Sequence, residues 1–204
     1  MSRVAGVILA AGTSSRLGSP KQLLDLGGTP VLAHTVAGVR NTTLDPIIVV
    51  LGHASEQIAA TVDLSAEQTI VNADYRTGQS SSVRAALSAI ADDVDGVLFI
   101  LGDQPLVEPA VIEQLIDAFQ QGHNPIVQPR YREGRGNPVL IGRSLFAELA
   151  EVGGDTGARP LIERHREQVR LVDVSEHSRP DDIDTLEDYL RIQRAFDARR
   201  DETE

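Results

Sequence analysis

The chain has 204 residues, of which 41% are hydrophobic and 24% are charged, and this is enough for one domain with a buried core. It contains no cysteine, which excludes disulfides, zinc–thiolate sites, iron–sulfur clusters and a cysteine nucleophile. The formal net charge is −11, and aromatic residues make up 3% of the chain. Binding of DNA or RNA needs a basic face or an aromatic platform, so we expect no nucleic-acid partner.

The apolar runs are of strand length. The longest, Ile47–Leu51 and Val97–Leu101, are far too short to span a bilayer. The first residues lead into an apolar run that lacks the length and the small-residue cleavage site of a signal peptide. We therefore expect a cytoplasmic protein with no membrane partner.

Short buried strands alternate with amphipathic helices over the first 124 residues. Continuous runs rich in Val and Ile predict strands at Val4–Leu9, Ile47–Leu51, Thr69–Asn72 and Val97–Leu101. Apolar residues at helical spacing predict helices over Pro30–Arg40, Ser55–Val62, Ser80–Ala91 and Glu108–Gln121. In the first helix we expect Thr29 as N-cap and Pro30 as the first helical residue. This order predicts an α/β fold: a three-layer, Rossmann-like, mostly parallel sheet with helices on both faces.

The pattern changes after residue 124. Strands are expected at Pro125–Arg130, Asn137–Ile141 and Val169–Val174. Helices are expected over Arg143–Ala150, Ala158–His165 and Thr185–Ala198. We find no internal repeat, low-complexity linker or clear boundary, which predicts a single domain over residues 1–204. The charged run 194–204 is expected to be a frayed helix end.

The most informative stretch follows the first predicted strand and reads L-A-A-G-T-S-S-R-L-G-S-P-K, from Leu9 to Lys21. Gly12 and Gly18 allow tight turns and let backbone N–H groups approach a ligand closely. Arg16 and Lys21 place two positive charges in an otherwise acidic chain. A glycine-rich loop with local cations, at the carboxyl end of a strand, is typical of polyphosphate binding. The alternative is an ordinary strand-to-helix loop with two surface cations.

Two better-known phosphate motifs do not fit this stretch. A Walker loop has Gly, four residues and then Gly-Lys-Ser/Thr, whereas five residues separate Gly12 from Gly18 and Ser19 follows. The dinucleotide fingerprint G-x-G-x-x-G is also missing.

The ordered residues of the loop resemble the signature of the MobA-like nucleotidyltransferases, and within them that of the molybdenum cofactor cytidylyltransferases. Five further motifs are similar to those of that family and follow in its order, namely G-Q-S-S-S-V at Gly78, G-D-Q-P at Gly102, R-G-N-P-V at Arg135, G-D-T-G-A-R at Gly154 and D-I-D-T-L-E-D at Asp182. The resemblance covers the chain from Val4 to about Leu190. It implies a nucleotide-diphospho-sugar transferase-like fold, with a nucleotide-binding half at 1–124 and an acceptor-binding part at 125–193.

The activity that this resemblance implies is transfer of CMP from CTP to the phosphate of molybdopterin cofactor, with Mg²⁺ as cofactor and pyrophosphate as the leaving group. Arg16, Lys21 and Asp103 would be the catalytic residues, with the two cations neutralising the triphosphate. Asp103 and Asp184 would bind Mg²⁺ through oxygen. The residues expected to bind the nucleotide are Leu9, Ala10, Ala11, Gly12, Thr13, Ser14, Lys21, Asn72, Gly78, Gln79, Ser80, Ser82 and Asp103.

Several of these residues also have structural interpretations. Asp103 can form an Asx-turn, and Ser80 or Ser81 can cap a helix. Asp184, with Glu187 three residues later, fits a capping box, so it is the second metal ligand, the start of the last helix, or both. The five histidines have no metal-ligand or triad spacing, and we interpret them as surface or loop residues.

The acceptor is expected to bind after residue 124, at Arg135, Asn137 and Arg159, since arginine suits a phosphate group. Asn137 stands where members of the family commonly have His. In the family L-A-A-G accompanies cytidylyl transfer and L-A-G-G guanylyl transfer, and the methyl group of Ala11 can crowd a purine. The sequence therefore favours CTP as the donor.

Two alternatives remain open at this point. The chain can transfer a nucleotide from CTP, GTP or another triphosphate to a different phosphorylated small molecule, such as a sugar phosphate. It can also bind a nucleotide without turnover. If molybdopterin cofactor is the acceptor, a molybdoenzyme that receives the product is the expected client.

Overall fold

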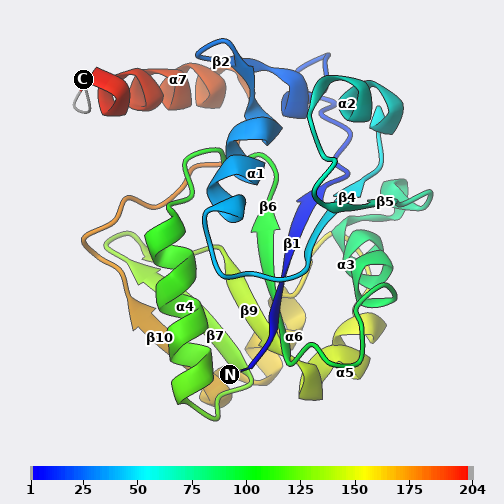
Figure 1. Cartoon of the computed structure of the whole chain (residues 1–204), viewed down its shortest axis with the longest axis vertical. Coiled ribbons are helices and arrows are strands. Elements are labelled where there is room, and N and C mark those ends of the chain that lie inside the picture. The colour runs from blue at the N-terminus through cyan, green and yellow to red at the C-terminus, as the bar shows by residue number, and fades with distance from the viewer. Residues whose placement is uncertain (1, 202–204) are drawn as a thin grey trace.

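The computed structural model describes residues 2–201, which form a large eight-stranded sheet and a small two-stranded one (Figure 1). The strands of the large sheet run in the order β10-β7-β9-β6-β1-β4-β5, with β8 paired to β7. Their bounds are β1 Val4–Ala10, β4 Ile47–Leu51, β5 Gln68–Val71, β6 Gly96–Leu101, β7 Ile126–Tyr131, β8 Gly134–Arg135, β9 Val139–Gly142 and β10 Val169–Asp173. The small sheet pairs β2 (Asp25–Leu26) with β3 (Thr29–Pro30).

Most neighbouring strands of the large sheet are parallel. β1 pairs in parallel with β4 and β6, β4 with β5, and β7 with β10. β9 is antiparallel to both β6 and β7, and β8 is antiparallel to β7. Because β7, β8, β9 and β10 follow residue 124, both parts of the chain contribute strands to the same sheet.

Helices cover both faces of this sheet (Figure 1). One buried cluster includes side chains of α1, α2 and α4, and another includes side chains of α3, α5 and α6. β1 contributes to both, because Val4 and Ile8 point to the first cluster whereas Ala5 and Val7 point to the second. The helix bounds are α1 Val31–Arg40, α2 Ser55–Thr61, α3 Gln79–Leu87, α4 Pro109–Gln121, α5 Phe146–Glu151, α6 Arg159–Arg164 and α7 Leu186–Asp201.

The predicted fold class is confirmed, and the predicted strands lie within two residues of the observed ones. The expected start of α1 is wrong, because Pro30 occupies the cap position itself and Thr29 pairs within the small sheet. The helix expected to run to Ala91 ends at Leu87. The helix expected from Arg143 begins as a 3₁₀ turn before α5.

The C-terminal helix α7 is continuous to Asp201 and contacts other elements of the fold. The fraying expected from residue 194 stays a prediction. The ring of Phe196 meets the ring of His34 edge-on at 4.9 Å, and Arg199 Nη1 donates to the carbonyl of Leu106 at 3.3 Å. His34 lies in α1 rather than in a loop, and it is partly buried. Residues 202–204 of the predicted tail lie outside the described residues.

Across residues 2–201, none of the helices combines the length and the apolar character that crossing a membrane requires.

The substitution Asp173→Asn tests an ion pair between two strands. Arg130 of β7 and Asp173 of β10 are partners in register, and Arg130 Nη2 lies 2.6 Å from Asp173 Oδ2. Hydrogen bonds from Arg130 and then Ser175 lower the pKa of Asp173 from 3.8 to about 2. A carboxyl group with a lowered pKa stabilises the fold above its unfolded pKa, and this stabilisation is lost as the pH falls through the folded pKa. We expect the Tm difference between wild type and Asp173→Asn to shrink between about pH 4 and about pH 2.

Thermal melts over this pH range measure the effect. Asp117→Asn is the matched control, since Asp117 is an exposed carboxylate on α4. A Tm difference for Asp173→Asn that stays constant over the range would contradict the role of this ion pair.

Candidate functional site

A cleft of about 640 Å³ opens at the carboxyl edge of the large sheet. It is formed by the segments that follow β1, β5 and β6, by the loop between α5 and α6, and by the residues before α7. Open α/β sheets bind ligands at this edge. The lining residues are Leu9, Ala11, Gly12, Thr13, Ser14, Ser15, Arg16, Lys21, Gln22, Tyr75, Arg76, Thr77, Gly78, Gln79, Ser82, Leu101, Asp103, Asp155, Asp182 and Asp184.

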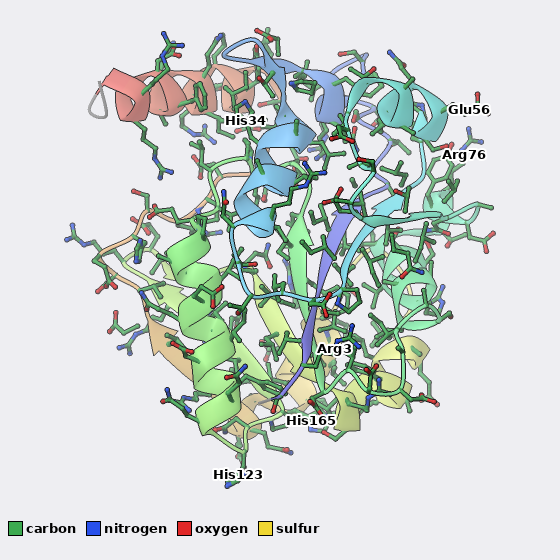
Figure 2. The ribbon with its side chains drawn as sticks, viewed as in Figure 1. Arg3, His34, Glu56, Arg76, His123 and His165 are labelled. Carbon is green, nitrogen blue, oxygen red and sulfur yellow. The ribbon has the colours of Figure 1, made fainter. Side chains whose placement is uncertain are left out.

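The side-chain view locates this edge within the molecule. Arg76, which lines the cleft, lies toward the end to which β1 points (Figure 2). Arg3, His123 and His165 lie toward the opposite end (Figure 2). These three side chains are therefore remote from the cleft.

The glycine-rich loop turns back on itself around Ser14. Ser14 has a positive φ of 52°, and its carbonyl accepts a hydrogen bond from Leu17 N at 3.0 Å. Its hydroxyl accepts a hydrogen bond from Lys21 N at 2.9 Å. Gly18, with φ of 70°, completes the turn in a conformation that favours glycine. The loop thereby brings Lys21 back to the cleft.

Lys21 joins two carboxylates in the cleft. Its Nζ donates to Asp103 Oδ2 and, at 3.0 Å, to Asp184 Oδ1. Arg16 Nη1 lies 3.7 Å from Asp184 Oδ2. The side chains of Lys21 and Asp103 are only 14% and 13% exposed, whereas that of Arg16 is 70% exposed. The two cations of the loop and the two predicted metal ligands thus share one cleft.

The carboxylates keep Lys21 charged. Burial by itself lowers the pKa of Lys21, but the charges and hydrogen bonds of Asp103 and Asp184 outweigh it, and the pKa is raised above its usual value. Lys21 is also the sole lysine in the sequence. The one lysine side chain of the sequence therefore lies in this cleft.

Asp182 is a third carboxylate in the cleft. Its pKa is raised, first by burial and then by the charge of Asp103. Gln104 holds it in place, since Gln104 Nε2 donates to Asp182 Oδ1 at 2.5 Å and to the carbonyl of Pro180 at 3.3 Å.

Asp184 is not the residue that caps α7. The capping pair is Thr185 and Asp188: Asp188 N donates to Thr185 Oγ1 at 3.2 Å, and Thr185 N donates to Asp188 Oδ2 at 2.9 Å. This is a reciprocal capping box one residue later than the Asp184–Glu187 pair that the sequence suggests. The predicted capping role of Asp184 is therefore wrong, and its carboxylate faces Lys21 instead.

The segment before α3 is held in place by close packing and hydrogen bonds with the loop between α5 and α6. Gly78 has φ of 110°, and a Cβ on it would lie 2.5 Å from the carbonyl oxygen of Gly154. Ser80 N and Ser80 Oγ both donate to that carbonyl, at 3.2 and 2.6 Å. Gln79 N donates to Asp155 Oδ1 at 3.1 Å. The N-terminus of α3 is thus capped by a distant loop, and neither Ser80 nor Ser81 is its N-cap.

Three residues expected to bind the nucleotide do not line the cleft. Ala10 is buried in the core, and the hydroxyl group of Ser80 donates a hydrogen bond to the carbonyl of Gly154. Asn72 is buried and donates through Nδ2 to Ser81 Oγ at 2.8 Å and to Ser82 Oγ at 3.0 Å. Asn72 and Ser80 therefore hold the α3 segment in shape. The other expected residues line the cleft, namely Leu9, Ala11, Gly12, Thr13, Ser14, Lys21, Gly78, Gln79, Ser82 and Asp103.

The three expected acceptor residues lie outside the lining of this cleft. Arg135 is exposed on β8, and Arg159 is exposed at the start of α6. The carbonyl of Asn137 accepts a hydrogen bond from Tyr131 Oη at 2.8 Å, and a cis peptide bond joins Asn137 to Pro138. Their role in acceptor binding remains a prediction.

The cleft also contains residues that the sequence did not single out as binding residues: Ser15, Gln22, Tyr75, Arg76, Thr77, Leu101 and Asp155. Tyr75–Thr77 directly precede Gly78, so their position could have been inferred from that motif. Gln22 follows Lys21, is 2% exposed and donates through Nε2 to the carbonyl of Ala10 at 2.8 Å. Asp155 belongs to the part of the chain expected to bind the acceptor, and its Oδ1 accepts a hydrogen bond from Gln79 N in the segment before α3.

The carboxylates fit a divalent cation that is shared with a phosphate. Lys21 Nζ lies between Asp103 and Asp184, so oxygens of both converge on a point that already accommodates a positive charge. Among residues 2–201, no group of three or more His, Cys, Asp or Glu side chains is arranged to hold a metal ion. Mg²⁺ usually takes one or two carboxylates and completes its shell with water and substrate phosphates, which suits this arrangement.

A mostly parallel α/β sheet, with a cationic loop and paired carboxylates at its carboxyl edge, is the architecture of a nucleotide-binding transferase. Residues 6–169 match the family model of the MobA-like NTP transferase domain, and the chain belongs to this family. Its activity class is nucleotidyl transfer.

Several proteins of known structure or name are similar to this chain. Rv0371c from Mycobacterium tuberculosis H37Rv is similar, with 36% identity, a TM-score of 0.87 and coverage of 95% of this chain and 98% of that one. A crystal structure of Rv0371c in complex with manganese is similar as well, with 35% identity, a TM-score of 0.84 and coverage of 95% of this chain and 99% of that one. A nucleotidyl transferase from Methanothermobacter thermautotrophicus is 26% identical, with a TM-score of 0.79 and coverage of 96% and 98%. The nicotine blue oxidoreductase of Paenarthrobacter nicotinovorans is 30% identical over 93% of this chain and 96% of its own length.

The substitution Gly78→Ala tests the locked α3 segment. Alanine at φ of 110° is strained, and its Cβ would meet backbone atoms of Gly154 rather than a flexible side chain. We expect a loss of stability of about 1–3 kcal/mol and weaker nucleotide binding. Denaturant unfolding and calorimetry measure the two effects. Gly153→Ala is the control, because a Cβ there meets open space, and equal effects of both substitutions would contradict the close packing at Gly78.

Proposed function

We propose that this chain transfers CMP from CTP to the phosphate of molybdopterin cofactor, with Mg²⁺ and release of pyrophosphate. The observation that carries the proposal is the contact of Lys21 with both Asp103 and Asp184, beside Arg16, in a cleft at the carboxyl edge of the sheet. The base and the acceptor come from the motif resemblance, and the residue roles come from the resemblance and the geometry together.

The reaction needs positioning and charge neutralisation more than covalent help. An oxygen of the acceptor phosphate attacks the α-phosphorus of CTP, and the bond from that phosphorus to the bridging oxygen of the β-phosphate breaks. Pyrophosphate leaves with the electron pair, and a phosphoanhydride forms. A phosphate monoester is largely ionised near neutral pH, since its second pKa is about 6, so no general base is required.

The balance of charges in the cleft supports the proposal that triphosphate binding requires a divalent cation. Its cationic side chains are Arg16, Lys21 and Arg76, and four carboxylates line it with them. A triphosphate entering this cleft would meet more negative than positive side chains. A bound Mg²⁺ held by Asp103 and Asp184 would supply the missing charge and orient the phosphates. Lys21 and Arg16 would then stabilise the charge that develops at the α-phosphate.

Ala11 is the residue that supports a pyrimidine base. Ala11 and Tyr75 both line the cleft and pack closely on Gly52, where an added Cβ would lie 2.8 Å from Ala11 Cβ and 2.7 Å from Tyr75 Cβ. The motif resemblance implies that the methyl group of Ala11 crowds a purine. Guanylyl transfer is the alternative that this residue disfavours.

Acceptor binding by Arg135, Asn137 and Arg159 rests on the resemblance. An exposed arginine can bind a phosphate with two parallel hydrogen bonds, which suits Arg135 and Arg159. A sugar phosphate or another phosphorylated small molecule is the alternative acceptor. The proposal includes a cytoplasmic location and a molybdoenzyme as the client.

A triphosphate panel tests the donor and the acceptor. Purified chain with Mg²⁺ and molybdopterin cofactor is expected to release pyrophosphate with CTP at least about tenfold faster than with GTP, ATP or UTP. Sugar phosphates replace the cofactor in parallel reactions. Release with another triphosphate and not with CTP would refute the base assignment, and CTP binding without turnover of any acceptor would favour a non-catalytic protein.

The same samples test for redox chemistry, because one relative is named an oxidoreductase. Oxidation of added NADH or NADPH by an added dye as electron acceptor, with no pyrophosphate release from any triphosphate, would replace the transferase proposal for this chain. A shared fold can host different reactions, so this control is informative.

Removal of either member of the buried ion pair tests the site. We expect Lys21→Ala and Asp103→Ala each to lower kcat about a hundredfold or more, because each removes a preorganised charge. Asp117→Ala is the control, and circular dichroism checks that the variants fold. EDTA is expected to abolish activity and added Mg²⁺ to restore it. Full activity in both cleft variants would contradict the assignment.

A further inference from the structure

The loop between α5 and α6 contributes a carboxylate to the nucleotide cleft. Asp155 Oδ1 accepts the backbone N–H of Gln79 at 3.1 Å, and the neighbouring Gly154 carbonyl accepts that of Ser80 at 3.2 Å. The first N–H groups of α3 are thereby occupied. These two N–H groups are therefore not free to donate to a nucleotide base in the cleft. Other groups that line the cleft must recognise the base.

Asp155 has hydrogen-bonding capacity left. It lines the cleft, and within residues 2–201 its Oδ2 has no hydrogen-bond partner. An ionised carboxylate accepts hydrogen bonds and donates none. Asp155 Oδ1 accepts a hydrogen bond from Gln79 N, whereas Oδ2 can accept a hydrogen bond from a ligand.

The sheet order indicates which part of a nucleotide lies beside Asp155. Asp103 follows β6, whereas Gln79 follows β5, and the strands between them are β1 and β4. Three strand spacings of about 4.8 Å separate the two ends of the cleft by about 14 Å. A triphosphate held by Lys21 at the β6 end therefore leaves its base at the β5 end, near Asp155.

We propose that Asp155 accepts a hydrogen bond from the exocyclic amino group of the base and thereby selects cytosine against uracil. The inference rests on the proposed nucleotide donor. Cytosine presents an amino group where uracil presents a carbonyl oxygen, and a carbonyl oxygen facing a carboxylate is repelled. In the proposed function the methyl group of Ala11 acts against the larger bases that also carry amino groups, so Ala11 and Asp155 together would favour a pyrimidine with an amino group.

The test is Asp155→Asn. The asparagine Oδ1 can still accept the N–H of Gln79, so the cap of α3 is kept, while its Nδ2 can donate to a carbonyl oxygen. We expect the ratio of the Kd for UTP to the Kd for CTP, measured by calorimetry with Mg²⁺, to fall at least about tenfold in the variant. Glu151→Gln is the matched control, because Glu151 is an exposed carboxylate on α5 and does not line the cleft. It is expected to leave the ratio unchanged.

Other outcomes overturn the inference. An unchanged ratio in Asp155→Asn, with both Kd values unchanged as well, means that the carboxylate only caps α3. An unchanged ratio in which CTP and UTP are weakened equally, with no weakening of dCTP, means that Asp155 contacts the ribose instead. If wild type binds CTP with this preference but transfers nothing, the proposed function fails while the inference stands. If wild type binds neither nucleotide, both fail.

Discussion

The ammonium group of Lys21 between Asp103 and Asp184 is the interaction on which the site depends. It joins three segments that are 82 and 163 residues apart in sequence. The pair with Asp103 is largely shielded from solvent, so removing one partner would leave the other as an unpaired, partly buried charge. The glycine-rich loop, the end of β6 and the start of α7 are thereby held to one geometry, which is what a reaction governed by positioning requires.

Neighbouring polar residues have different roles: some cap helices, and others face the cleft. Thr185 and Asp188 cap α7, which leaves Asp184 for Lys21. The loop with Gly154 and Asp155 caps α3, which leaves Ser82 and Gln79 at the wall of the cleft. At α7 the helix end is satisfied by residues other than the one that faces the ligand, and at α3 Asp155 uses Oδ1 for the cap while its Oδ2 is free of protein partners among the residues that the structure describes. Capping and binding therefore do not compete for the same atoms.

Much of this arrangement could be predicted from the sequence. Val- and Ile-rich runs located the strands because buried parallel strands are apolar on both faces. The loop from Leu9 to Lys21 could be assigned to the carboxyl edge because it directly follows such a strand. The capping box at α7 could not be resolved, since the pairs Asp184–Glu187 and Thr185–Asp188 both fit its spacing and differ by one residue.

Contacts between distant segments could not be predicted either. Asp155 and Gln79 are 76 residues apart, and nothing in either motif indicates that they meet. The same holds for Phe196 and His34, whose contact keeps the charged end of α7 against α1. Local patterns define which residues carry chemistry, whereas packing of the helices on the sheet decides which of them face one cleft.

The antiparallel strand β9 has a mechanical consequence. It comes from the later part of the chain, yet it pairs with β6 on one side and with β7 on the other. The parts assigned to donor and acceptor are thus joined by continuous backbone hydrogen bonds, and they cannot swing apart on a hinge without breaking the sheet. Any closure around two substrates must be made by the loops at its rim, so the rates of substrate entry and product release should follow the motions of those loops.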